Sequence, residues 1–80
     1  MKHSHRFVEE YKGMLAYGLD RKVDEATIIC YLQKFSDDEL MEALVPRLTD
    51  GELEEVFLLV TRLMRAHLTD AEYHTHFLKE

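Results

Sequence analysis

Three short segments in the second half of the chain share one helix-start pattern, at Phe35–Leu40, Leu48–Leu53 and Leu68–Tyr73. In each segment a Ser or Thr stands three residues before a Glu, which is the pattern of a capping box. The hydroxyl accepts from a backbone N–H of the first turn, and the Glu carboxylate accepts from the N–H of the Ser or Thr. An apolar residue before the cap and another five positions later add a hydrophobic staple. The pattern therefore predicts three helices that begin at these segments.

The three segments do not form an internal repeat. The spacing between successive Ser or Thr caps is unequal, and the residues that follow each cap differ in pattern. A helical solenoid needs a constant period over at least three stacked units. The shared segments are therefore local helix-start signals within one fold.

Two further helices are predicted in the first half of the chain. Apolar residues recur at helical spacing over Ser4–Tyr17, and Gly18 then suits the left-handed position just past a helix end. After a short charged connection over Asp20–Val23, Asp24 is predicted to cap a second helix. The side chains that this helix is expected to bury are Ile28, Tyr31, Leu32 and Phe35.

The third and fourth helices follow from the first two capped segments. The third is predicted over Ser36–Val45, because Pro46 lacks an amide donor and disfavours helical geometry at the preceding residue. The fourth is predicted over Thr49–His67 and carries a wide apolar stripe, which indicates a central helix in contact with several others. The residues of that stripe are Leu53, Val56, Phe57, Val60, Leu63 and Met64.

A fifth helix is predicted from Thr69 to the end of the chain, and strand-like alternation is absent from the whole sequence. The connections between the five helices are short, which is typical of antiparallel helix packing. We therefore expect an all-α fold, a compact bundle of about five short helices that forms a single domain over residues 1–80.

The net charge of −6 is concentrated in residues 35–80, which carry four Lys or Arg against eleven Asp or Glu. Most of these acids fall in or near the first turns of predicted helices, where they offset the positive end of the helix dipole. The acidity is thus explained by helix starts, although it still repels polyanions. We therefore expect neither nucleic acid nor a membrane surface as a partner.

The sequence also indicates a cytoplasmic protein. No apolar run approaches the roughly 20 residues of a membrane span, and the first residues lack the apolar stretch of a signal peptide. The single cysteine, Cys30, cannot form a disulfide within the chain, which favours a reducing compartment.

Five histidines raise the possibility of a metal site. His3 with His5, and His74 with His76, are spaced two residues apart, so on a helix the two rings of each pair point in different directions. Asp70 with His74, and Glu72 with His76, are instead four residues apart and could each supply two ligands. A stable site needs three or four converging groups, so we expect no metal or other cofactor. A small metal-binding protein is kept as an alternative.

Cys30 and the missing catalytic motifs bear on enzymatic activity. Cys30 lies off the apolar stripe of the predicted second helix, where it is either a thiol activated by Lys34 or a small packed residue. The sequence contains no Cys-x-x-Cys pair, Gly-rich phosphate loop, His-Glu-x-x-His motif or nucleophile elbow. We therefore expect a protein without catalytic or cofactor-binding residues.

A helix-turn-helix reading is the second alternative, because the third and fourth predicted helices are joined by a short turn. DNA-binding proteins usually place basic or amide side chains at the start of the recognition helix. Here that region is acidic, which weakens binding to a polyanion. The acids concerned are Asp50, Glu52, Glu54 and Glu55.

An apolar residue on a polar face is the clearest functional signal. On the predicted fourth helix, Leu58 falls among Glu54, Thr61, Arg62 and Arg65, away from the apolar stripe. An apolar spot ringed by charges fits a protein-docking patch or a homodimer seam. We therefore expect a small non-enzymatic protein–protein interaction domain, adaptor or regulatory, whose partner is another protein or a second copy of this chain.

Overall fold

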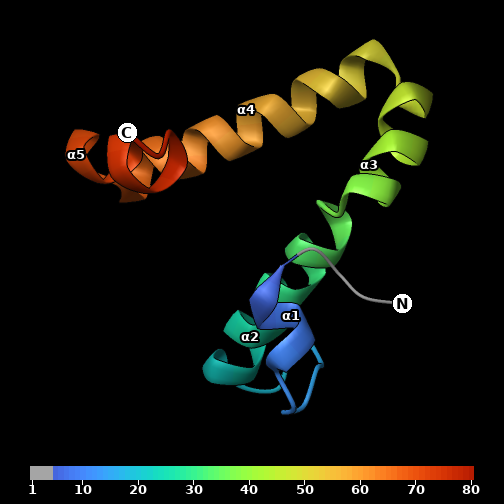
Figure 1. Ribbon diagram of the computed structural model, residues 1–80, viewed down its shortest axis with the longest axis vertical. Helices are drawn as coiled ribbons and strands as arrows, with labels where there is room; N and C mark the ends of the chain where they lie inside the picture. Colours follow the sequence, from blue (N-terminus) through green and yellow to red (C-terminus); the bar gives the residue numbers. More distant parts are fainter. Residues whose placement is uncertain (1–4) are drawn as a thin grey trace. The chain divides into compact units, whose positions relative to one another are not determined.

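The structure, a computed structural model, describes residues 5–80 and contains only helical elements there. No strand occurs in this range, so the all-α prediction is confirmed (Figure 1). The α-helices are α1 (Arg6–Glu10), α2 (Arg21–Phe35), α3 (Asp38–Leu44), α4 (Asp50–His67) and α5 (Asp70–Glu72). A 3₁₀ turn, η1 (Val45–Arg47), follows α3, and a π-helical turn, η2 (Tyr73–Phe77), follows α5.

The chain divides into two compact units, Met1–Arg47 and Leu48–Glu80. The boundary falls between η1 and the Thr49 cap of α4. That residues 1–80 form one domain therefore stays a prediction, and each unit is described by itself.

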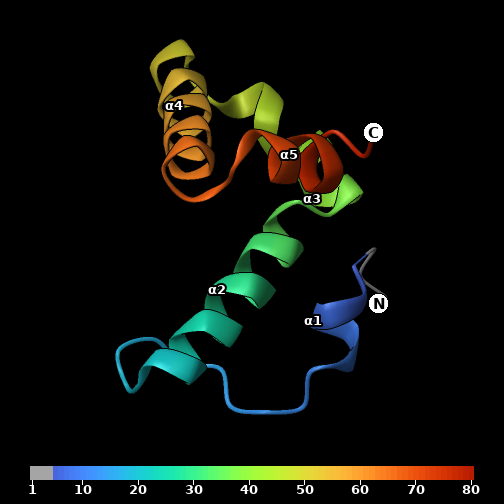
Figure 2. The same ribbon diagram turned by 90° about the vertical axis from the view of Figure 1, so that its left-hand side faces the viewer.

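In the first unit α1 lies beside α2, as Figures 1 and 2 both show. The backbone N–H of Val8 donates to the Gln33 side-chain oxygen at 2.9 Å. Just before α1, His5 Nε2 lies 2.9 Å from Ser36 Oγ, at the C-terminal end of α2. Side chains from the end of α2 thus hold the short first helix in place.

The predicted first helix is wrong beyond Glu10, and its predicted start at Ser4 lies outside the described residues. Tyr11 takes an extended backbone conformation, and its hydroxyl donates to the Met14 carbonyl at 3.0 Å. The Tyr11 side chain folds over Gly13, where a Cβ would collide with the ring and its hydroxyl. Glycine also disfavours a helix interior by about 1 kcal/mol relative to alanine. The segment after Glu10 therefore leaves the helix and makes its hydrogen bonds elsewhere.

Thr27 of α2 receives that segment. Its hydroxyl accepts from the Ala16 N–H and donates to the Ala16 carbonyl, both at 3.0 Å. Thr27, Ala26 and Cys30 are the buried residues of α2. Their small side chains let backbone approach this face of the helix closely.

The predicted buried face of α2 is therefore wrong. Tyr31 is 72% exposed, and the other three residues expected in the core, Ile28, Leu32 and Phe35, are also exposed. Helical periodicity located an apolar stripe, but the chain packs its extended segment against the neighbouring small residues instead.

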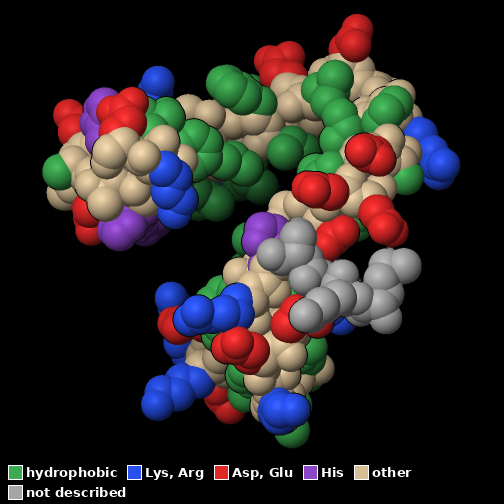
Figure 3. All heavy atoms as spheres, viewed as in Figure 1, with side chains coloured by type: hydrophobic (Ala, Val, Ile, Leu, Met, Phe, Trp, Pro, Cys, Tyr) green, Lys and Arg blue, Asp and Glu red, His purple; other side chains and the backbone are tan. Residues whose placement is uncertain are grey.

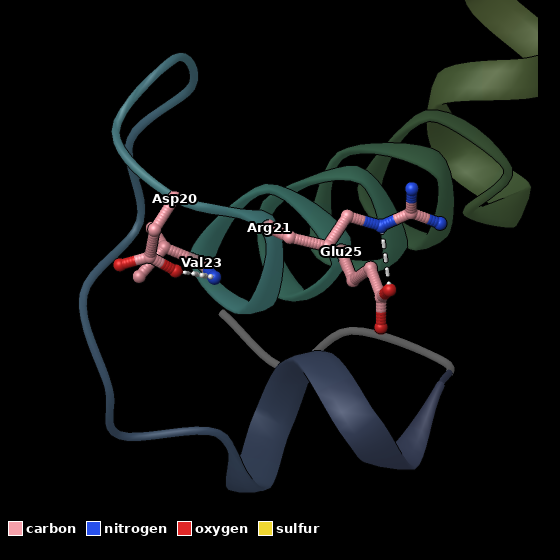
Figure 4. Close-up of polar contacts among 4 residues, drawn as sticks. All are labelled: Asp20, Arg21, Val23 and Glu25. Atoms are coloured by element: carbon pink, nitrogen blue, oxygen red, sulfur yellow. Dashed lines mark hydrogen bonds and ion pairs between the residues drawn. The ribbon is translucent and has the colours of Figure 1, made fainter.

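The start of α2 also differs from the prediction. Asp20, rather than Asp24, is the cap: its carboxylate accepts from the Val23 N–H at 2.9 Å, as Figure 4 shows. Arg21 and Glu25 form an ion pair at 2.7 Å on the first turns (Figure 4). Asp24 instead accepts from the Gly18 N–H at 2.8 Å. Gly18 has a φ of 97°, so its left-handed conformation was predicted correctly, but it lies in a loop and does not end a helix.

α3 begins one residue later than predicted. Asp37 is its cap and accepts from the Glu39 N–H at 3.3 Å. Ser36 closes α2 instead, with its N–H donating to the Leu32 carbonyl at 2.8 Å. α3 ends near the predicted position, and Pro46 is accommodated in η1.

The second unit contains α4, α5 and η2, and its two helix starts were predicted correctly. In the first capping box, the Glu52 N–H donates to Thr49 Oγ1 at 3.1 Å and the Thr49 N–H donates to Glu52 Oε1 at 2.9 Å. The same two bonds join Thr69 and Glu72, at 3.1 and 2.8 Å. The reciprocal pairs fix where α4 and α5 begin.

Candidate protein-interaction face

An apolar stripe runs along α4, and its residues are exposed except for Met64, which is half-buried. We use the term α4 stripe for the six predicted residues, Leu53, Val56, Phe57, Val60, Leu63 and Met64. Phe57 is the most exposed of them, at 68%, and no residue of α4 is buried. Figure 3 shows hydrophobic side chains along this helix. The helix thus presents a line of large apolar side chains that its own unit does not cover.

The rest of the unit packs within itself. The rings of Tyr73 and Phe77 stack at 5.2 Å between centroids, and Tyr73 meets the His74 ring edge-on at 5.8 Å. These aromatic contacts lie within η2. That α4 is a central helix in contact with several others stays a prediction, and no residue of α4 is buried.

Leu58 occupies the predicted position on the other face of α4. It is 54% exposed and lines a shallow hollow along the helix. The other lining residues are Thr61, Arg62, Arg65 and Ala66, so three of the four predicted neighbours gather around it. Neither Arg62 nor Arg65 forms an ion pair with any carboxylate among residues 5–80. The predicted apolar spot is thus present with its two arginines, but the predicted Glu54 does not line it.

The charges of α4 are separated along its axis. The acidic side chains Asp50 and Glu52 lie in the first turn, and Arg65 and His67 lie in the last. Each group is favoured by the nearby end of the helix dipole. His67 is exposed and its ring makes no hydrogen bond with residues 5–80, so the ring does not cap the helix. The helix is therefore negative at one end, apolar in the middle and positive at the other.

The histidine pairs do not assemble a metal centre in the described residues. His74 Nδ1 lies 2.7 Å from Glu80 Oε1, and Glu72 is engaged in its capping box. His5 contacts Ser36, and His3 lies outside the described residues. Within residues 5–80 no three His, Cys, Asp or Glu side chains are placed to hold one ion.

Cys30 is the packed residue rather than the open thiol. Its side chain is 1% exposed and sits on the buried face of α2 with Ala26 and Thr27. Burial removes the access that a reactive thiol requires. Cys30 therefore contributes to the small core of the first unit.

The capping box of Glu72 is the described site where a pKa departs from its usual value. The Thr69 N–H, followed by the Thr69 hydroxyl, holds the pKa of the Glu72 carboxyl below its usual 4.5. Both bonds stabilise the ionised carboxylate. The group is fully exposed, so this shift reflects helix capping and not a catalytic environment.

Comparison with known proteins gives no indication of function, so the function is inferred from the structure. The chain matches no protein-family model, and no curated protein or solved structure is significantly similar to it. Among residues 5–80, no helix combines the length and apolar character needed to cross a bilayer.

Proposed function

We propose that this chain is a small non-enzymatic adaptor or regulatory domain that binds protein through the α4 stripe. The exposure of the stripe carries the proposal: its large apolar side chains, with Phe57 at 68%, lie in one line along a helix that has no buried residue. Contiguous apolar surface of this kind marks interaction sites in proteins that are otherwise polar outside. Amphipathic helices commonly meet partners through side chains at such spacing.

Two features of the second unit support a protein-binding role for the α4 stripe. The capping box at Thr49 and Glu52 fixes the start of α4, so the stripe is presented on a defined helix. The acidic first turn disfavours a phosphate backbone as the ligand. A cytoplasmic setting is part of the proposal, on the argument that the single Cys30 cannot form a disulfide within the chain.

Affinity capture with matched variants tests the proposal. The wild-type chain, Phe57→Asp and Leu58→Asp are immobilised in equal amounts and exposed to native lysate, and bound proteins are identified by mass spectrometry. Each variant's helix content is checked by circular dichroism, because an aspartate is placed on the same helix in both. The self-association of the three proteins is measured in parallel by sedimentation velocity.

Partner binding or self-association that is lost in Phe57→Asp and kept in Leu58→Asp supports the α4 stripe. Loss in Leu58→Asp alone assigns the interface to the hollow and contradicts the proposal. A wild-type chain that stays monomeric and captures nothing overturns the interaction function altogether.

A further inference from the structure

We propose that the occupant of the α4 stripe is the same stripe of a second copy, with the two helices antiparallel. This inference rests on the proposed function and names its partner. It follows from the spacing of the apolar side chains along α4 and from the charges at the two ends of that helix.

The spacing is that of a helix–helix seam. Leu53, Phe57, Val60 and Met64 are separated by four, three and four residues, the alternation that keeps side chains on one line facing a partner helix. α4 has 18 residues and is about 27 Å long at 1.5 Å per residue. The seam is centred between Phe57 and Val60, at the middle of the helix.

A centred seam can be self-complementary. In an antiparallel pair about a two-fold axis, Phe57 of one copy faces Val60 of the other, and Leu53 faces Met64. Such an isologous arrangement buries the same patch on both copies and closes as a dimer. It also covers Phe57, the most exposed apolar residue of the stripe, in both copies.

Charge selects the antiparallel orientation. Continuing the seam by three residues at each end reaches Asp50 and His67. The antiparallel pair places the acidic first turn of one helix beside the last turn of the other, which carries Arg65, whereas a parallel pair places Asp50 beside its own copy. Facing Asp50 carboxylates in a parallel pair would lie within about one Debye length, about 8 Å at physiological salt, and would repel each other. Antiparallel helix dipoles add to the same preference.

A single helix pair lies at the small end of specific interfaces, so we expect a dissociation constant on the order of micromolar. The dimer should therefore predominate above about 10 μM and dissociate on dilution below about 1 μM.

Cysteine cross-linking tests both the partner and the orientation. Leu53→Cys and Met64→Cys are made in the wild-type background, where the native Cys30 is buried and is not expected to cross-link. The two proteins are oxidised separately and as an equimolar mixture at about 200 μM, with Leu58→Cys as the control on the opposite face. The disulfide-linked species are identified by non-reducing electrophoresis and mass spectrometry.

The antiparallel pair predicts a disulfide between position 53 of one copy and position 64 of the other, formed only in the mixture. In that pair two copies of position 53 are about 16 Å apart along the axis, too far for a disulfide. Cross-linking of Leu53→Cys with itself indicates a parallel pair and overturns the proposal. Cross-linking of Leu58→Cys as efficiently as the mixture indicates random collision, with the same consequence.

Sedimentation equilibrium distinguishes a failure of the proposed self-association from a failure of the proposed protein-binding function. In a two-fold pair Phe57→Asp acts twice, so we expect the dissociation constant to rise about 100-fold or more, while Leu58→Asp changes it less than threefold. A wild-type chain that is monomeric at 200 μM overturns the second copy as occupant. If that monomer still captures a protein through Phe57, the proposed function stands and only the identity of the partner is wrong.

Discussion

The hydroxyl of Thr27 is bonded to both backbone groups of Ala16, accepting from its N–H and donating to its carbonyl at 3.0 Å each. Thr27 is 5% exposed, so these bonds are made on the buried face of α2. A backbone segment outside a helix or sheet must find partners for its N–H and C=O groups. Thr27 supplies both for Ala16 and so ties the non-helical segment after α1 to α2.

Thr27→Val is predicted to destabilise the protein by about 1–3 kcal/mol, because it leaves both backbone groups of Ala16 without their partner while nearly preserving shape. Urea denaturation measures the change. Thr75→Val removes an exposed hydroxyl and serves as the control, with an expected change within about 0.5 kcal/mol. Equal stabilities of the two variants would show that the Thr27 bonds do not hold the segment.

Thr49→Ala is predicted to cost about 0.5–2 kcal/mol of stability, since it removes the hydroxyl that accepts from the Glu52 N–H. Thermal and urea denaturation give the free energy of unfolding. Thr61→Ala, in the interior of the same helix, is not expected to destabilise, because alanine favours helix more than threonine. A negligible effect of Thr49→Ala would mean that the cap does not stabilise α4.

Glu72 is predicted to make the start of α5 sensitive to acid. Its pKa in the folded protein lies below the usual 4.5, with the Thr69 N–H as the main cause. The stabilisation is therefore fully present above about pH 4.5 and is lost as the pH falls through the lower folded pKa. An NMR titration of the Glu72 carboxyl carbon measures this pKa directly.

The variant Thr69→Ala removes one side of that capping box and should move the Glu72 pKa upward, toward 4.5. Thr49→Ala disrupts the other box and should leave Glu72 unchanged. A Glu72 carboxyl that titrates at its usual value in the wild type is incompatible with the capping box seen here.

Cys30 is predicted to resist thiol reagents in the folded protein. With 1% of the side chain exposed, reaction requires local opening of the first unit. We expect modification by a disulfide reagent to be about 100-fold slower in buffer than in denaturant, as an opening free energy of a few kcal/mol implies. Equal rates in the two solvents would place the thiol at the surface.

The helix starts in the second unit could be predicted because their signals are local. Thr49 with Glu52 and Thr69 with Glu72 need only four consecutive residues to form a capping box. The Ser36 box failed although its pattern is the same. α2 extends through Phe35, so Ser36 closes that helix, and Asp37 takes over as the cap of α3.

The first unit could not be predicted at the same level because its packing is decided by distant residues. Apolar periodicity over residues 4–17 indicates one helix, yet the turn of Tyr11 over Gly13 and the Thr27 bonds to Ala16 give a different path. Thr27 carried no signal in the sequence, since a buried hydroxyl is recognised only through its partner. The face of α2 was misassigned for the same reason.

The residues of the candidate interface could be predicted from the sequence, but their exposure could not. The α4 stripe and the polar surroundings of Leu58 follow from helical spacing and are present. Whether a stripe is covered depends on what packs against it, which periodicity does not encode. Its exposure within the second unit changes Phe57 and Val60 from expected core residues into the proposed contact surface.

Sedimentation equilibrium of the wild-type chain beside Phe57→Asp, combined with capture from native lysate, tests the α4 stripe most directly. The monomer mass is 9.5 kDa, and we predict that at about 10 μM the wild type approaches twice that mass, whereas Phe57→Asp stays near the monomer mass. A wild type that remains at 9.5 kDa and binds no protein would contradict the assignment of the α4 stripe as an interface.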